Sequence, residues 1–136
     1  MDSASIELPG SEITAIWLGD DGALRIVFSK ALIIKTMTGS NERTRWWQTG
    51  ALVLEKATVE EDSQDLPCEP MVCAGGDIED NVFTYRDMIP LPLASRGRVG
   101  CDLGFHDSTY RLRARGSSIR LEMVEVAKYI EHIRPN

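Results

Sequence analysis

The sequence has few of the residues that most often carry catalysis or covalent cross-links. It contains three cysteines, Cys68, Cys73 and Cys101, and two histidines, His106 and His132. An odd and sparse set of cysteines argues against the disulfide scaffold of small secreted proteins, so we expect reduced thiols. The two histidines are the only side chains whose ordinary pKa lies near neutrality, and neither lies in a nucleophile, metal or phosphate-loop motif.

Long apolar segments are also absent. No apolar run is longer than the one at 31–34, whereas a membrane-spanning helix needs about 20 apolar residues. Residues 1–5 show no basic start followed by an apolar stretch, which is the pattern of a signal peptide. We therefore expect a cytoplasmic protein without a membrane partner.

Positive charge is scarce overall and unevenly distributed. The chain has 15 Lys and Arg against 21 Asp and Glu, a formal net charge of −6. Residues 1–95 hold 7 basic and 16 acidic residues, whereas residues 96–136 hold 8 basic and 5 acidic residues. Nucleic acids and anionic membrane surfaces attract positively charged proteins, so the total charge disfavours both, while a local cationic patch stays open.

What the sequence does contain is a succession of short apolar runs separated by Gly, Pro, Asn, Asp and Ser. This pattern is typical of antiparallel strands, and the two glycines of 19–22 predict a hairpin turn. We predict one mostly β domain over 1–136, folded as an antiparallel β-sandwich or a partly open β-barrel. Pro90 and Pro92 place their strand at a sheet edge. The expected strands cover 13–18, 24–28, 32–37, 46–57, 82–85, 88–93 and 99–105.

The stretch 58–80 differs from these runs because it contains eight acidic residues, two prolines and the pair Gly75-Gly76. We predict a long acidic exposed loop near 58–80 rather than a central strand.

The C-terminal part gives the most detailed prediction. Residues 99–105 alternate between apolar and small or acidic side chains, as a half-buried strand does. A hairpin of 110–114 and 119–123 about a turn at 115–118 would place Arg113 opposite Arg120 and Arg111 opposite Glu122. Residues 123–133 fit either a short C-terminal helix or a continued strand.

The arginines of that hairpin form the first candidate binding site. Arg111, Arg113 and Arg120 would project from one face, and two like charges placed opposite each other favour a bound anion. The functional interpretation is an anionic ligand or an acidic partner surface. The structural interpretation is that Glu122 or the 58–80 loop neutralises them.

The tryptophan pair is the second candidate. Adjacent residues on a strand point in opposite directions, so one of Trp46 and Trp47 is expected in the core and the other at an exposed or partly covered position. An exposed ring would suit a protein partner or a stacking ligand.

Zinc is the alternative that the cysteines leave open. Three thiolates and an imidazole, from Cys68, Cys73, Cys101 and His106, would satisfy a tetrahedral zinc ion. Cys101, however, falls on the apolar face of the 99–105 strand, where a buried thiol behaves as a hydrophobic residue. His106 with Asp107 and Ser108 is explained as a turn.

Taken together, the residues favour a non-catalytic binding or interaction module that recognises a protein or an anionic ligand through Arg111, Arg113, Arg120, Trp46 and Trp47. No cofactor is expected, and a homodimer formed by pairing exposed edges is a further expectation. The alternatives are a small metal-dependent enzyme or zinc-binding protein, and a carrier of a small apolar ligand between sheets. The sequence leaves the partner, the oligomeric state and the choice between sandwich and barrel open.

Overall fold

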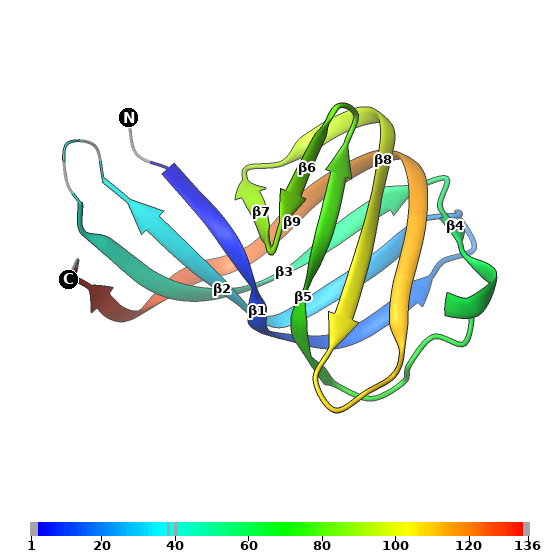
Figure 1. Cartoon of the computed structure of the whole chain (residues 1–136), viewed down its shortest axis with the longest axis horizontal. Coiled ribbons are helices and arrows are strands. Elements are labelled where there is room, and N and C mark those ends of the chain that lie inside the picture. The colour runs from blue at the N-terminus through cyan, green and yellow to red at the C-terminus, as the bar shows by residue number, and fades with distance from the viewer. Residues whose placement is uncertain (1–2, 38, 40, 135–136) are drawn as a thin grey trace.

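A computed structural model describes residues 3–37, 39 and 41–134. Nearly all of this chain is antiparallel β-strand, with a single 3₁₀ turn, and the predicted fold class is confirmed (Figure 1). The elements are β1 (Ser3–Leu18), β2 (Leu24–Thr36), β3 (Arg43–Glu55), β4 (Thr58–Val59), η1 (Glu61–Ser63), β5 (Met71–Asp80), β6 (Phe83–Arg86), β7 (Met88–Leu91), β8 (Ala94–Phe105) and β9 (Arg111–Ile133).

Six of the strands close into a ring. The sheet runs in the order β6-β5-β8-β9-β3-β2-β1-β7, and β5 pairs again with β1. That closing contact is short, comprising the pairs Glu12 with Val72 and Ile13 with Met71. The ring of β1, β2, β3, β9, β8 and β5 is therefore a partly open barrel.

The alternation of side chains along these strands fills the barrel. Because successive residues point to opposite faces, alternate apolar residues of the barrel strands contribute to one continuous apolar cluster. Its largest fully buried side chains include Phe28, Ile26, Leu52 and Leu103. Burial of these side chains supplies the main driving force for closing the sheet.

Beyond the barrel, four of the same strands continue as a twisted sheet that we call the arm. The arm consists of 3–8 of β1, 30–36 of β2, 43–48 of β3 and 124–133 of β9, with β7 paired to its β1 edge. Figure 1 shows it extending away from the barrel. The barrel and the arm therefore share four continuous strands.

Several local predictions are confirmed. The turn at 19–22 joins β1 to β2 as an antiparallel hairpin, with Leu18 opposite Leu24. The 99–105 strand lies within β8, with its apolar side chains buried. Pro90 lies in β7, which forms the end of the sheet, where a missing N–H breaks no interior ladder.

The predicted hairpin with a turn at 115–118 is wrong. Residues 111–133 form one strand, β9, which changes partners at this point instead of reversing direction. Residues before the change pair with β8 and β4, and Ser118 pairs with Glu55 of β3 and with Arg96 of β8. A Cβ on Gly116 would lie 2.7 Å from the Glu55 carbonyl oxygen, so this glycine permits a close strand approach rather than a turn.

The predicted loop over 58–80 is wrong in its second half. β5 occupies 71–80 and is a strand of the barrel wall, paired with β8, β6 and β1. The Gly75-Gly76 pair fits inside the sheet because a Cβ on Gly76 would lie only 2.1 Å from the Asp102 carbonyl oxygen. The acidic connection is the shorter segment between β4 and β5, which includes η1.

The possible C-terminal helix is also wrong, since 123–133 continues β9 as a strand. In the part of the chain that the structure describes, no helix is long and apolar enough to cross a membrane.

Candidate interaction surface

Two of the predicted arginines, Arg111 and Arg113, belong to an ion-pair network on the outer wall of the barrel. Arg113 lies opposite Asp102 of β8 and not opposite Arg120. Asp102 accepts a hydrogen bond from Arg111 Nε, and its other oxygen lies 3.6 Å from Arg113 Nε. Arg113 also donates to Asp62 at 3.2 Å. The two guanidinium groups are therefore matched by two carboxylates of the same chain.

Arg120 has its own carboxylate partners. It donates to Glu55 at 3.0 Å and to Glu122 at 3.3 Å. The hydrogen bond that Arg120 donates to Glu55 is the main cause that raises the pKa of Arg120. The predicted arginines thus have carboxylate partners within the chain, but Glu122 and the acidic connection supply only two of the four, and Asp102 of β8 and Glu55 of β3 supply the others. The register that placed two like charges opposite each other is wrong.

The tryptophans lie on the arm, at the other end of β9 from Arg111 and Arg113. Trp46 lies opposite Ile33 and Tyr129, and its ring packs edge-on against Tyr129 with centroids 5.3 Å apart. It also packs against the barrel core. Trp47 carries an ammonium group over its ring from Lys128 at 4.7 Å. Both rings are partly covered, and the structure does not combine the tryptophans and the arginines into one face.

The zinc candidates do not form a group either. Among the described residues, no three His, Cys, Asp or Glu side chains gather closely enough to hold a metal ion. Cys73 and Cys101 are buried, whereas Cys68 is exposed. Burial raises the pKa of Cys73 to about 11 and that of Cys101 to about 12, so both are neutral thiols near pH 7.

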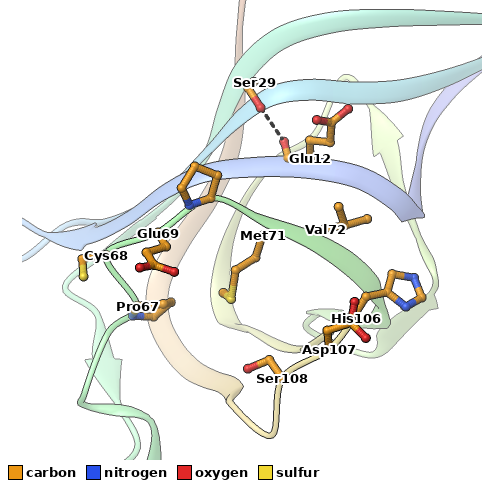
Figure 2. A pocket seen from close by; sticks show the side chains of 11 residues that line it. Glu12, Ser29, Pro67, Cys68, Glu69, Met71, Val72, His106, Asp107 and Ser108 are labelled. Atoms are coloured by element: carbon orange, nitrogen blue, oxygen red, sulfur yellow. Dashed lines mark hydrogen bonds between the residues drawn. The ribbon is translucent and has the colours of Figure 1, made fainter.

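His106 lines the rim of an open pocket of about 600 Å³ between the acidic connection and the turn that joins β8 to β9. The backbone N–H of His106 donates to the Val72 carbonyl at 2.9 Å, and the turn at 106–108 is confirmed. Figure 2 shows Cys68 and His106 on opposite sides of this pocket. They are not arranged as a nucleophile and its base.

The arm presents a surface that the sequence did not predict. Val124, Val126, Tyr129 and Ile130 of β9 are all exposed, and Val126 reaches 81%. Exposed apolar residues are usually scattered singly over a protein surface. Four large exposed apolar side chains within one short stretch of strand are therefore unusual.

This same part of β9 also has a free edge. On one side, β3 pairs with β9 as far as Ile133. On the other side, pairing with β8 ends at Arg120, and the Leu121 N–H donates to the Leu93 carbonyl at 3.0 Å. Beyond Leu121, no strand of the described chain pairs with this edge.

Two irregularities shape the free edge. The β3–β9 register shifts between the pairs Thr49 with Val124 and Trp47 with Lys128, and again at Ile130. The Gln48 side chain donates to the Glu125 carbonyl at 2.8 Å, which fixes the first of these bulges. Bulges and charged residues protect a sheet edge against indiscriminate strand pairing. The exposed apolar side chains are therefore a more specific recognition feature of this edge than its unpaired backbone groups.

The sequence contained a partial signal for this surface. Apolar residues occur at 124, 126, 127, 129, 130 and 133, a pattern in which 124 and 126 suit a strand whereas 126, 130 and 133 suit a helix. The two register shifts produce this mixed spacing, and only the pairing with β3 reveals them.

Comparison with known proteins adds no relative: no family model matches the sequence, and neither a curated protein nor a solved structure gives a match.

Proposed function

We propose that the protein is a non-catalytic interaction module that binds a protein partner through the arm. The observation that carries this proposal is the coincidence of Val124, Val126, Tyr129 and Ile130 with the free edge of β9. Large apolar side chains at the centre of a surface, with charged residues around them, are the usual composition of a protein interface.

The surroundings of these side chains support a protein rather than a small ligand. Tyr129 is braced by Trp46, so an aromatic side chain is held in a fixed position on an exposed face. Rigid aromatic groups contribute strongly to protein interfaces because little side-chain entropy is lost on binding. Glu125, Lys128 and Glu131 alternate along the same strand and would give the partner a defined register.

Other parts of the chain favour this proposal over the alternatives. Arg111, Arg113 and Arg120 already have carboxylate partners, so an anion would have to displace them. The barrel interior is occupied by its own apolar side chains, which supports surface recognition over a carrier of apolar ligands.

Site-specific photocrosslinking in the native host tests the proposal. A photoreactive phenylalanine analogue at Val126 should cross-link to one discrete protein, and mass spectrometry would identify the segment in contact. The matched control carries the same analogue at Trp17, an exposed aromatic position on the barrel wall. A second copy of the chain is one acceptable partner. Equal and diffuse cross-linking from both positions would contradict the proposal.

A further inference from the structure

A second surface, separate from the arm, lies at the end of the barrel where the turn between β5 and β6 meets the start of β8. The turn residue Val82 is 89% exposed and its neighbour Phe83 is 61% exposed. Phe83 stacks on Tyr85 with ring centroids 6.4 Å apart. The apex of this hairpin is therefore apolar and projects into solvent.

Asn81 fixes this apex to β8. Its backbone N–H donates to the Arg98 carbonyl at 2.8 Å, its side-chain oxygen accepts from the Arg98 N–H at 3.0 Å, and its side-chain amide donates to the Arg96 carbonyl at 2.9 Å. Gly97 makes this contact possible, because its φ is +120° and a Cβ there would lie 2.1 Å from the Asn81 oxygen. Arg96 and Arg98 are consequently tied through their backbones to the residue that precedes Val82.

Further cations lie at the same end of the barrel. Lys56 and Arg115 line a shallow pocket of about 350 Å³ together with Gly97, Gly116 and Ser117. We call Lys56, Arg96, Arg98 and Arg115 the basic rim; all four residues are exposed.

The basic rim differs from the other arginine clusters in having no ion pairs within the described chain. Arg25, Arg45, Arg86, Arg111, Arg113 and Arg120 each have a carboxylate within 4 Å, whereas the rim residues have none. The nearby Glu55 is bound to Arg120, and Asp80 accepts a hydrogen bond from Ser95. Glu79 lies on the same outer face as Arg115, across Gly100. The rim keeps its positive charge in a protein whose net charge is −6.

We propose that the Val82–Phe83 apex and the basic rim together bind the surface of an anionic phospholipid bilayer. The apex is convex and carries two adjacent apolar side chains, which suits insertion among lipid headgroups. The cations beside it suit lipid phosphates, and each contributes to attraction toward an anionic leaflet. A soluble anion would account for the cations but would leave the exposed apex without a role.

The acidic total charge disfavours a membrane surface only when charge is treated as uniform. At physiological ionic strength, charges more than about 8–10 Å from the surface are largely screened. Arg96 and Arg98 lie on the segment that Asn81 binds, and the neighbouring carboxylate of Asp80 accepts hydrogen bonds from Ser95 and Asn81. The local field at the apex, rather than the net charge, therefore decides the interaction.

Vesicle co-sedimentation of the full chain tests this inference. The protein should bind vesicles of phosphatidylcholine mixed with phosphatidylserine and should not bind phosphatidylcholine alone. The double variant V82S/F83S should lose this binding, and R96Q/R98Q should weaken it by roughly fivefold for each cation removed. Matched controls are V126S, an exposed valine on the arm, and R43Q, an exposed arginine on the arm; both should bind as the wild type does.

Four results would overturn the inference. Equal binding to neutral and anionic vesicles would remove the role of the rim, and equal loss in R43Q would reduce the effect to net charge. Displacement from vesicles by inorganic phosphate at constant ionic strength would assign the rim to a soluble anion. Failure to bind any vesicle would remove the bilayer as a ligand and would leave the photocrosslinking result at Val126 unaffected.

Discussion

Ser63 Oγ donates a hydrogen bond of 2.6 Å to the Arg111 carbonyl. The same hydroxyl oxygen accepts from the Arg113 N–H at 3.0 Å, so one fully buried side chain satisfies two backbone groups at the start of β9. Tyr110 adds a hydrogen bond from its hydroxyl to the Ser63 carbonyl at 2.8 Å. These contacts hold the acidic connection against the barrel, and they position Asp62 next to Arg113.

Replacing Ser63 by alanine should lower the free energy of unfolding by about 1–3 kcal/mol. The loss follows because S63A leaves a buried donor and a buried acceptor without a partner. Urea unfolding measures it. The control is S117A, since Ser117 is exposed and its hydroxyl bond to the Glu55 carbonyl is long, at 3.4 Å. Equal stability of S63A and S117A would contradict this account.

Asp102 should contribute little to stability and much to the charge of the barrel wall. Its side chain is 38% exposed, so D102N should cost less than about 1 kcal/mol, and the cost should shrink in high salt. The substitution should at the same time leave Arg111 without a carboxylate partner and leave Arg113 with Asp62 alone. Binding of inorganic sulfate, followed by NMR shifts, is expected for D102N and not for the wild type. Sulfate binding by the wild type at these arginines would show that they are not neutralised.

The three cysteines should react very differently with a thiol reagent. Cys68 is exposed, whereas burial raises the pKa of Cys73 to about 11 and of Cys101 to about 12. In the folded protein, one thiol should therefore react rapidly with a chromogenic disulfide reagent. The other two thiols should react only after a denaturant has unfolded the chain. C68S should abolish the rapid phase. A rapid phase that persists in C68S would mean that the barrel interior is accessible.

Asp21 should make the stability of the β1–β2 hairpin depend on pH in the acidic range. The hydrogen bond that its carboxylate accepts from Arg25 is the main cause that lowers its pKa from 3.8 to about 2. A folded-state pKa below the unfolded value gives stability that is present above pH 4 and is lost as the pH falls through 2. D21N keeps the oxygen that accepts the Ala23 N–H and removes the charge.

The stability difference between the wild type and D21N should therefore shrink between pH 4 and pH 2. Thermal unfolding followed across that interval measures the difference. A constant difference would mean that the charge of Asp21 is not involved.

How far the sequence predicted the fold depended on whether each local pattern had one physical cause. The 19–22 turn and the alternation of 99–105 involve neighbouring residues only, and both predictions are confirmed. Gly116-Ser117-Ser118 has the composition of a turn but marks a change of strand partners, and the distinction depends on β3 and β8. Gly75-Gly76 similarly allows β8 to approach β5 closely. Because β8 lies far along the chain, the local sequence does not show this.

The candidate sites show the same limit. The sequence pointed to charged and aromatic residues, but the residues that contact them come from distant segments of the chain. Arg113 meets Asp62 and Asp102 only after β8 pairs with β9 and the acidic connection folds over both. The basic rim likewise depends on the hydrogen bonds between Asn81 and the segment around Gly97. No local sequence pattern predicts this contact.

The four strands shared by the barrel and the arm have a mechanical consequence. β1, β2, β3 and β9 run through both parts, so a pull on the arm along these strands loads several rows of backbone hydrogen bonds in shear at once. A partner bound to the arm would therefore be held at a fixed orientation relative to the barrel. Tension would be transmitted to the barrel wall before any single strand could peel away.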